Sequence, residues 1–118
     1  MSRQRDKGTK FETMVAAYLA EVLGADAHRL GMGGANDRGD VHVDGLGVTI
    51  ECKNCQRMEL AAWLDEAVRE SERAQTALGA VVHHRKGRGS ARVADSYVTM
   101  RLGDFAALML KLMEVGNE

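Results

Sequence analysis

Apolar residues recur along the chain at two spacings, and the longer spacing predicts three helices. In three segments the apolar positions lie three or four residues apart, which puts them on one face of a helix. These segments are residues 7–24, 60–79 and 105–112. Thr9 fits the N-cap of the first helix, Gly24 its end and Gly79 the end of the second. The last segment is expected to be an amphipathic helix that closes the fold.

Shorter runs rich in β-branched residues predict strands between these helices. They are residues 27–30, 40–43, 48–53, 80–84 and 97–100. The predicted order is therefore helix, three strands, helix, two strands, helix. This order favours a mixed α/β or α+β domain with one sheet flanked by helices. We expect residues 1–118 to form a single domain, because this length is close to the common domain size.

The second and third strands predict a hairpin with two opposed carboxylates. Whether the turn at Gly45 has two residues or four, the same register places Asp40 opposite Glu51. Side chains alternate along a strand, so Lys53 lies on the same side as Glu51, and Ile50 on the other. Two carboxylates so close repel each other unless a cation lies between them.

Such a pair of hard oxygen ligands suits Mg²⁺, with Mn²⁺ as a substitute. A bound ion would activate a water and neutralise a phosphate, and Lys53 could position that water or stabilise the developing charge. A second interpretation stays open. Opposed acidic residues can also keep an edge strand soluble, with Lys53 as a surface counter-charge.

Four short motifs, in this order, resemble the PD-(D/E)xK nuclease superfamily and within it the archaeal-type and phage Holliday-junction resolvases. The motifs are Lys7-Gly8-x-x-Phe11-Glu12, the glycine-rich stretch 31–34, Gly39-Asp40 and Glu51-Cys52-Lys53. The resemblance covers most of the chain and implies a restriction-endonuclease-like core of order α-β-β-β-α-β-β-α. One departure is Gly39, which stands where the family has proline.

The resemblance also implies roles for particular residues. Asp40 and Glu51 would bind the metal, Lys53 would be the catalytic lysine, and Glu12 would reach the metal from the first helix. Glu12 can equally be read as the capping-box partner of Thr9. The implied protein is a homodimeric, Mg²⁺-dependent endodeoxyribonuclease of DNA recombination or repair that cuts four-way junctions. Two rivals are another nuclease of the same fold (nicking, repair or restriction-like) and a non-catalytic DNA-binding module.

The distribution of charge matters more than its sum, since the formal net charge is only −1. Basic residues cluster near the start of the chain and again after the fourth strand, as expected of surfaces that contact phosphates. The candidate DNA-binding residues are Arg5, Lys7, Lys10, Arg38, Arg85, Lys86, Arg88 and Arg92. The second cluster could also be a solvated hairpin tip. Net acidity is unusual for a junction-binding dimer.

The cysteines and the chain's hydropathy exclude several other classes. Cys52 and Cys55 are too few for a disulfide framework. Together with His83 and His84 they resemble a zinc site, but neighbouring strand residues point to opposite faces, so both histidines could not easily bind one ion. No apolar run is long enough to span a bilayer and the first residues are polar, so a cytoplasmic protein is expected (in the host cytoplasm if phage-encoded).

Overall fold

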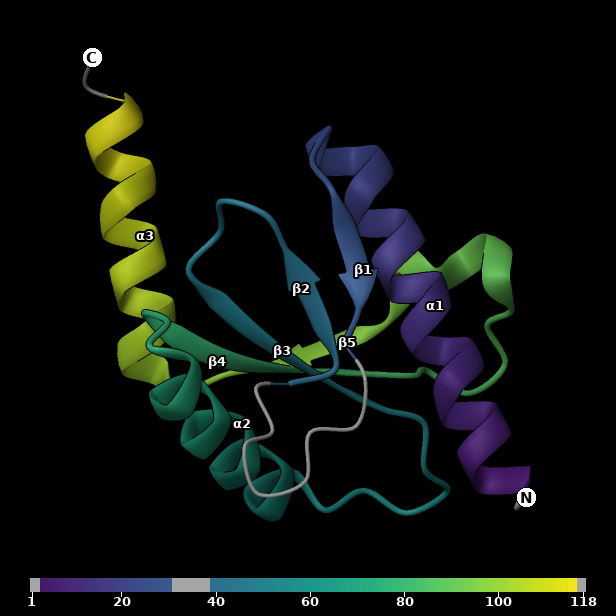
Figure 1. Cartoon of the computed structure of the whole chain (residues 1–118). Coiled ribbons are helices and arrows are strands. Elements are labelled where there is room, and N and C mark those ends of the chain that lie inside the picture. The colour runs from purple at the N-terminus through teal and green to yellow at the C-terminus, as the bar shows by residue number, and fades with distance from the viewer. Residues whose placement is uncertain (1–2, 31–38, 117–118) are drawn as a thin grey trace.

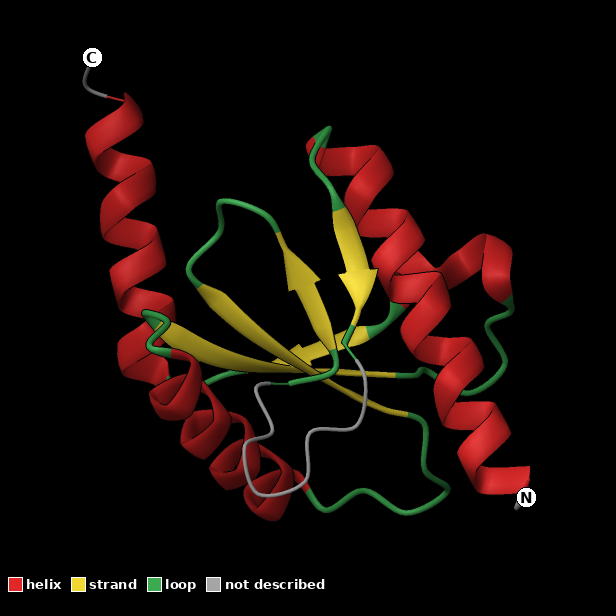
Figure 2. Cartoon of the chain, in the orientation of Figure 1, coloured by secondary structure: helices red, strands yellow, loops and turns green. Residues whose placement is uncertain are grey.

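The computed structural model has the element order expected from the sequence. It describes residues 3–30 and 39–116; the side chains of residues 3–6 and 90 also lie outside the description. The elements are α1 (Arg3–Leu23), β1 (Ala27–Arg29), β2 (Val41–Val43), β3 (Val48–Lys53), α2 (Leu60–Ala74), β4 (Leu78–His83), the 3₁₀ helix η2 (Ser90–Asp95), β5 (Tyr97–Thr99) and α3 (Leu102–Gly116). The predicted α-β-β-β-α-β-β-α order is confirmed, with η2 as an addition in the loop before β5 (Figures 1 and 2).

The strands form one mixed sheet in the order β1-β2-β3-β4-β5. β3 and β4 are parallel, and every other neighbouring pair is antiparallel. The parallel pair follows from the chain path, because α2 carries the chain from the end of β3 back to the start of β4. Helix α1 lies across β1 and β2, while α2 lies along β3 and β4 (Figure 1).

Alternation along the strands divides the core between the two helices. Ile50 and Cys52 of β3 pack with Phe11 and Val15 of α1, in a cluster that also contains Val41 and Val43. On the other face of the sheet, Val81 of β4 packs against Trp63 and Ala67 of α2. The intervening residues of β3, Thr49 and Glu51, are also buried, and they face α2. The face of β3 that carries Thr49 and Glu51 is thus enclosed by α2.

The structure corrects the predicted boundaries of two helices. α1 begins at Arg3, so Thr9 lies inside the helix, where its carbonyl accepts a hydrogen bond from Thr13 Oγ1 at 3.0 Å, and is not an N-cap. α2 ends at Ala74 with Gln75 in the left-handed conformation (φ 56°), and Gly79 belongs to β4 instead of ending the helix. A Cβ at position 79 would lie 2.3 Å from the Ala67 carbonyl oxygen. Glycine is needed there because α2 approaches the strand closely.

The last helix does not close the fold. α3 buries none of its residues, and Leu102, Leu112 and Val115 are 78%, 72% and 66% exposed. Figure 1 shows α3 leaving the sheet beyond β5 and running along the outside of the molecule. Among the residues described, no helix combines the length and the apolar character that a membrane crossing requires.

Candidate active site

The register of β2 and β3 is the predicted one. Val41 is the partner of Ile50, which places the preceding residue, Asp40, opposite Glu51. Hydrogen bonds to β3 hold Asp40: its backbone N–H donates to the Ile50 carbonyl, and its Oδ2 accepts from the Cys52 N–H, both at 2.8 Å. The Asp40 carboxylate is therefore oriented by the backbone of the strand that carries Glu51 and Lys53.

Gly39, just before Asp40, has a structural reason to replace the family's proline. Its φ is +103°, which is far from the value near −65° that a proline ring imposes. A Cβ there would also lie 2.9 Å from Thr49 Cγ2 and 3.0 Å from the Ile50 carbonyl oxygen. Glycine therefore lets the backbone at Asp40 lie directly against β3.

Glu51 is a buried acid among other acids, with 4% of its surface exposed. Its carboxylate and those of Glu66 and Glu70 have oxygens within 4.8 Å of one another. Burial, the adjoining Glu70 carboxyl and the charge of Asp40 raise the pKa of Glu51 to about 12. Without a cation, Glu51 therefore holds a proton at neutral pH.

Lys53 provides the positive charge of this cluster. Its Nζ lies 2.8 Å from Glu66 Oε1 and 3.5 Å from Glu51 Oε1. Burial disfavours the charged ammonium, but the hydrogen bond with the Glu66 carboxylate and the charge of that carboxylate outweigh it, so the pKa of Lys53 is raised above its ordinary value. Lys53 is on the same face as Glu51, as predicted, and it stays charged.

Glu12 reaches the site from α1. Its Oε2 lies 3.4 Å from an Arg29 guanidinium nitrogen. Burial and the nearby charge of Asp40 raise the pKa of Glu12, and Arg29 partly offsets this. The capping-box interpretation of Glu12 is wrong, because α1 begins nine residues before it, at Arg3. Glu12 thus adds a carboxyl group beside Asp40.

Two acidic residues of α2, Glu66 and Glu70, join this site and were not among the residues predicted from the sequence. Glu70 is 2% exposed and lies seven residues after the buried Trp63. Glu66 lies between them, four residues before Glu70. That spacing put both glutamates on the inner stripe of the helix, and it was the signal available in the sequence.

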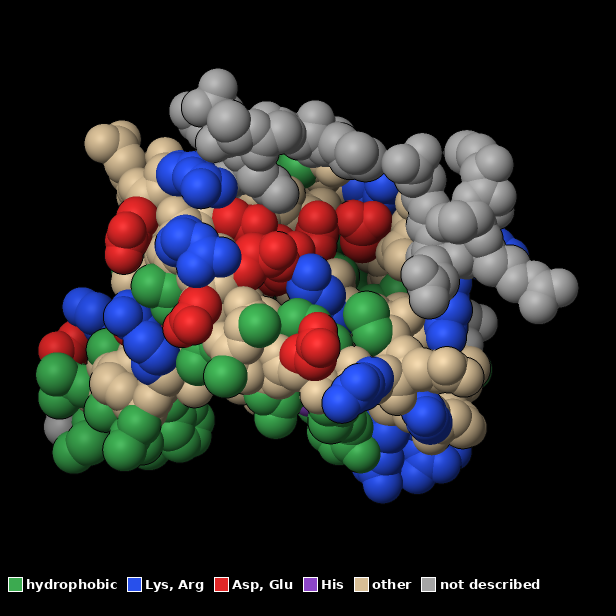
Figure 3. All heavy atoms as spheres, turned by 90° about the horizontal axis from the view of Figure 1, so that it is seen from below, with side chains coloured by type: hydrophobic (Ala, Val, Ile, Leu, Met, Phe, Trp, Pro, Cys, Tyr) green, Lys and Arg blue, Asp and Glu red, His purple; other side chains and the backbone are tan. Residues whose placement is uncertain are grey.

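The donor set fits a divalent metal ion. Carboxylate oxygens come from α1, β3, α2 and Asp40 just before β2, and they outnumber the basic groups beside them, Lys53 and Arg29. The Oε2 atom of Glu51 is buried, and no amide, hydroxyl, ammonium or guanidinium group of the described residues donates to it. Mg²⁺ prefers such hard oxygen ligands and keeps part of its water shell. Figure 3, which views the molecule from below, shows acidic side chains gathered in the middle of that side, with Lys and Arg side chains around them.

The predicted DNA-binding residues fall into four groups. Lys7 lines one hollow beside Lys53, and Arg85 and Lys86 line a second hollow that also contains Lys53. Lys10 is exposed on α1. Arg88 and Arg92 instead pair with Asp95, at 3.3 Å and 2.9 Å. Arg38 and the side chain of Arg5 lie outside the described residues, as does the glycine-rich stretch 31–34.

Cys55, His83 and His84 line one hollow, but within the described part of the chain they form no metal-binding group with Cys52. Cys52 is buried in the core against α1 and Cys55 is exposed, and both are free thiols. Burial raises the pKa of the Cys52 thiol above its ordinary value. His83 Nε2 is 2.9 Å from Thr99 Oγ1, and His84 Nε2 is 2.7 Å from the Arg88 carbonyl oxygen. One ring nitrogen of each histidine is thus engaged in a hydrogen bond within the protein.

Fold and residue order together define a class of protein. A mixed sheet with parallel β3 and β4, an aspartate opening β2 and a Glu-x-Lys closing β3 are the marks of the PD-(D/E)xK nucleases. The model of the family described as "Phage putative PDDEXK endonuclease" matches residues 3–115. The chain belongs to this family. No curated protein and no solved structure matches it.

Proposed function

We propose that the protein is a Mg²⁺-dependent DNA endonuclease whose active site consists of Asp40, Glu51 and Lys53, assisted by Glu12. The observation that carries the proposal is the pairing of Asp40 with Glu51 across β2 and β3, with Lys53 on the face of Glu51. An edge-strand solubility role does not account for this pair, because Glu51 is buried and β3 is a central strand of the sheet.

Each residue of the site has a separate task. Asp40 and Glu51 would hold the ion, and Glu12 would bind one of its waters or the ion itself. When bound, Mg²⁺ supplies an acidic water and neutralises the charge of the phosphate. The Cys52 N–H keeps the Asp40 carboxylate aimed at the site. Lys53 would orient the attacking water and stabilise the negative charge that builds up on the phosphate oxygens.

DNA is the substrate that the family implies, and four-way junctions are the substrate that we favour. The junction preference rests on the sequence resemblance to resolvases. The basic residues Lys7, Arg85 and Lys86 support a phosphate-binding role, because they border the hollows around Lys53. The enzyme would meet this substrate in the cytoplasm of the phage's host.

A homodimer is supported by the state of α3. A lone protomer leaves the apolar side chains of this helix in water, which is unfavourable for so large a patch. The exposed apolar residues of α3 are Leu102, Phe105, Leu108, Met109, Leu110, Leu112, Met113 and Val115. Pairing α3 with its copy would bury them and hold two active sites in one particle. Two sites are what a resolvase needs in order to cut both strands of a junction.

The decisive experiment compares cleavage of a synthetic four-way junction with cleavage of a linear duplex of the same sequence. Both are incubated with Mg²⁺ or with chelator, using wild type, Asp40→Asn and the control Asp65→Asn, an exposed aspartate of α2. We expect paired, Mg²⁺-dependent nicks in the junction alone, absent in Asp40→Asn and unchanged in the control.

The other outcomes distinguish the rival functions. Cutting of both substrates would keep the nuclease and remove the junction preference, in favour of a nicking, repair or restriction-like enzyme. Binding of the junction without cleavage, under Mg²⁺ and Mn²⁺ alike, would overturn the catalytic proposal and indicate a DNA-binding module.

A further inference from the structure

The free edge of the sheet carries a second group of candidate metal ligands, on and beside the strands β1 and β2 that adjoin the proposed nuclease centre. His28 of β1 and His42 of β2 are directly paired in the antiparallel register. Because Val41 and Val43 pack against α1, His42 between them faces the opposite side of the sheet. The two imidazoles therefore stand side by side on an exposed face, with ring centroids 5.5 Å apart.

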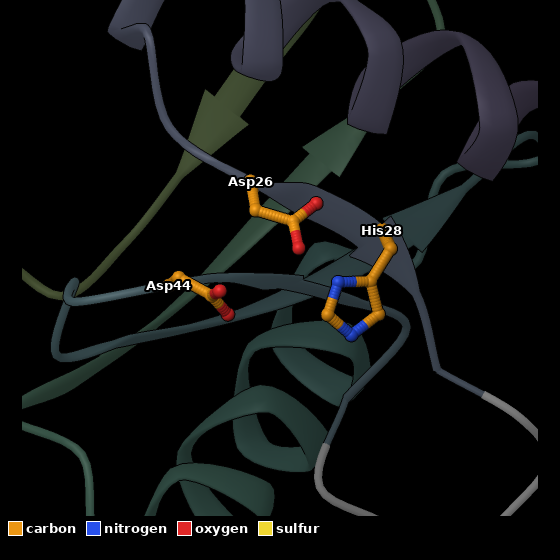
Figure 4. A group of neighbouring side chains, drawn as sticks. All are labelled: Asp26, His28 and Asp44. Carbon is orange, nitrogen blue, oxygen red and sulfur yellow. The ribbon is translucent and has the colours of Figure 1, made fainter.

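Two aspartates flank this histidine pair. Asp26 precedes β1 and Asp44 follows β2, and the Asp44 N–H donates to the Asp26 carbonyl at 2.9 Å. Asp26, His28 and Asp44 each offer a ligand atom, and these three atoms lie within 4.8 Å of one another. Figure 4 shows the three side chains projecting from neighbouring chain segments into a common space. His42 Nε2 adds a fourth candidate ligand, 3.2 Å from Asp44 Oδ1.

We propose that this cluster binds one Zn²⁺ ion, with His28, Asp26 and Asp44 as ligands and His42 completing the set. Two imidazole nitrogens and two carboxylate oxygens are ligands that Zn²⁺ accepts in a four-coordinate site. Mg²⁺ is disfavoured here, because it selects all-oxygen ligands, whereas imidazole suits zinc and similar transition metals. The nuclease centre, built from carboxylates and one lysine, has the opposite preference. The two centres should therefore select different ions.

The ion would stabilise the pairing of β1 with β2 at the edge of the sheet. β1 has three residues and pairs with β2 alone, so few backbone hydrogen bonds hold it. The ligands belong to both strands or adjoin them, so a shared ion would link β1 to β2. β2 begins directly after Asp40, and β1 ends at Arg29, the partner of Glu12. The bound ion would thus stabilise the two strands that adjoin the proposed nuclease centre.

The test is a Zn²⁺ titration of metal-free protein against a chromophoric chelator, with millimolar Mg²⁺ present. A Cys55→Ser background removes the exposed thiol as a competing ligand. We expect one equivalent of Zn²⁺ to bind, and His28→Ala and His42→Ala each to weaken it by at least about tenfold. Asp40→Asn should bind the same equivalent unchanged. Equal zinc affinity in the histidine variants, or no binding by the Cys55→Ser protein, would overturn the proposal.

Thermal unfolding gives a second measurement on the same variants. Because Zn²⁺ would bind the folded state alone, we expect it to raise the Tm of the Cys55→Ser protein, and not that of the His28→Ala, His42→Ala double variant. Both histidines are exposed, so the double variant should fold without the ion. An equal rise in both proteins would assign the zinc effect to another site and contradict the proposal.

Discussion

Helices α2 and α3 have the same length, 15 residues, but opposite relations to the sheet. α2 is the more polar helix, and it buries Trp63, Ala67, Ser71 and even Glu70. α3 is the more apolar helix, and it buries nothing. Hydrophobicity therefore did not decide which helix is covered. Chain path did: α2 is the crossover between parallel neighbours β3 and β4, whereas α3 follows the edge strand β5.

Each helix presents an unfavourable group of side chains in the isolated protomer: clustered carboxyl groups on α2 and exposed apolar residues on α3. The inner face of α2 brings Glu66 and Glu70 to the buried Glu51, and such a collection of carboxyl groups needs protons or a cation. The surface of α3 needs an apolar partner. The difference teaches that burial follows position in the fold: on our proposal, α2 helps to form an ion site and α3 a contact with a second copy of the chain.

The largest effect should come from removing the carboxyl group of Glu51, which α2 encloses. Glu51→Gln takes away a proposed metal ligand and keeps the shape of the side chain. Loss of hydrogen-bonding partners of a metal ligand costs about 10–100-fold, so loss of the ligand itself should lower cleavage by more than about 100-fold. Steady-state cleavage rates over a range of Mg²⁺ concentrations would measure this. A rate within tenfold of wild type would remove Glu51 from the metal site.

The same residue predicts a pH dependence of stability in metal-free protein. The pKa of Glu51 is raised from 4.5 to about 12 in the folded state, so its contribution is present below pH 4.5 and is lost as pH rises toward 12. The Tm in chelator should therefore fall with rising pH above 4.5, and less steeply in Glu51→Gln. Parallel Tm curves for the two proteins would mean that Glu51 titrates normally.

The acidic residues of the site show which parts of it the sequence can predict. The hairpin register followed from Gly45 and the alternation of Val43 and Val48, and it correctly paired Asp40 with Glu51. It could do so because side-chain alternation and turn position are local properties. Glu66 and Glu70 were missed because their role depends on which face of α2 meets β3. That is a tertiary property, and the acidic run around them resembled a solvated surface.

Local signals also failed where a tertiary contact gave a residue another role. Thr9 with Glu12 has the spacing of a capping box, yet α1 starts at Arg3. Gly79 resembles a helix terminator, but it is the point where β4 touches the Ala67 backbone. For α3, apolar periodicity predicted the helix correctly. It could not say whether the covering surface belongs to the same chain.

The α3 side of the comparison predicts a change of oligomeric state. Leu112 is 72% exposed in the protomer, so Leu112→Glu should leave folding intact and convert the proposed dimer to monomer. Light scattering after size-exclusion chromatography would measure the mass. Lys111→Gln is the matched control, because Lys111 is exposed next to Leu112 and its ammonium pairs within α3, with Glu114. An unchanged dimer in Leu112→Glu would place the interface elsewhere, and a monomeric wild type would contradict the dimer itself.

A smaller effect is expected at Glu66, a positioning residue that acts through Lys53. Glu66→Gln removes the carboxylate that lies 2.8 Å from Lys53 Nζ and helps to raise the lysine's pKa. Cleavage should fall by about tenfold. The alkaline limb of the pH–rate profile should also move to lower pH, and Glu66→Asp should partly restore it. A lower rate with an unshifted profile would mean that Glu66 is merely structural.

The smallest effect separates two basic residues that sequence alone treated alike. Lys86 lines the hollow beside Lys53, whereas the charge of Arg92 is paired with Asp95 on η2. Each phosphate contact adds about one unit to the salt dependence of DNA binding. Lys86→Ala should therefore reduce the slope of log Kd against log salt concentration by about one, and Arg92→Ala should leave it unchanged. Equal slopes for the two variants would mean that the Asp95 pairing does not keep Arg92 from the DNA.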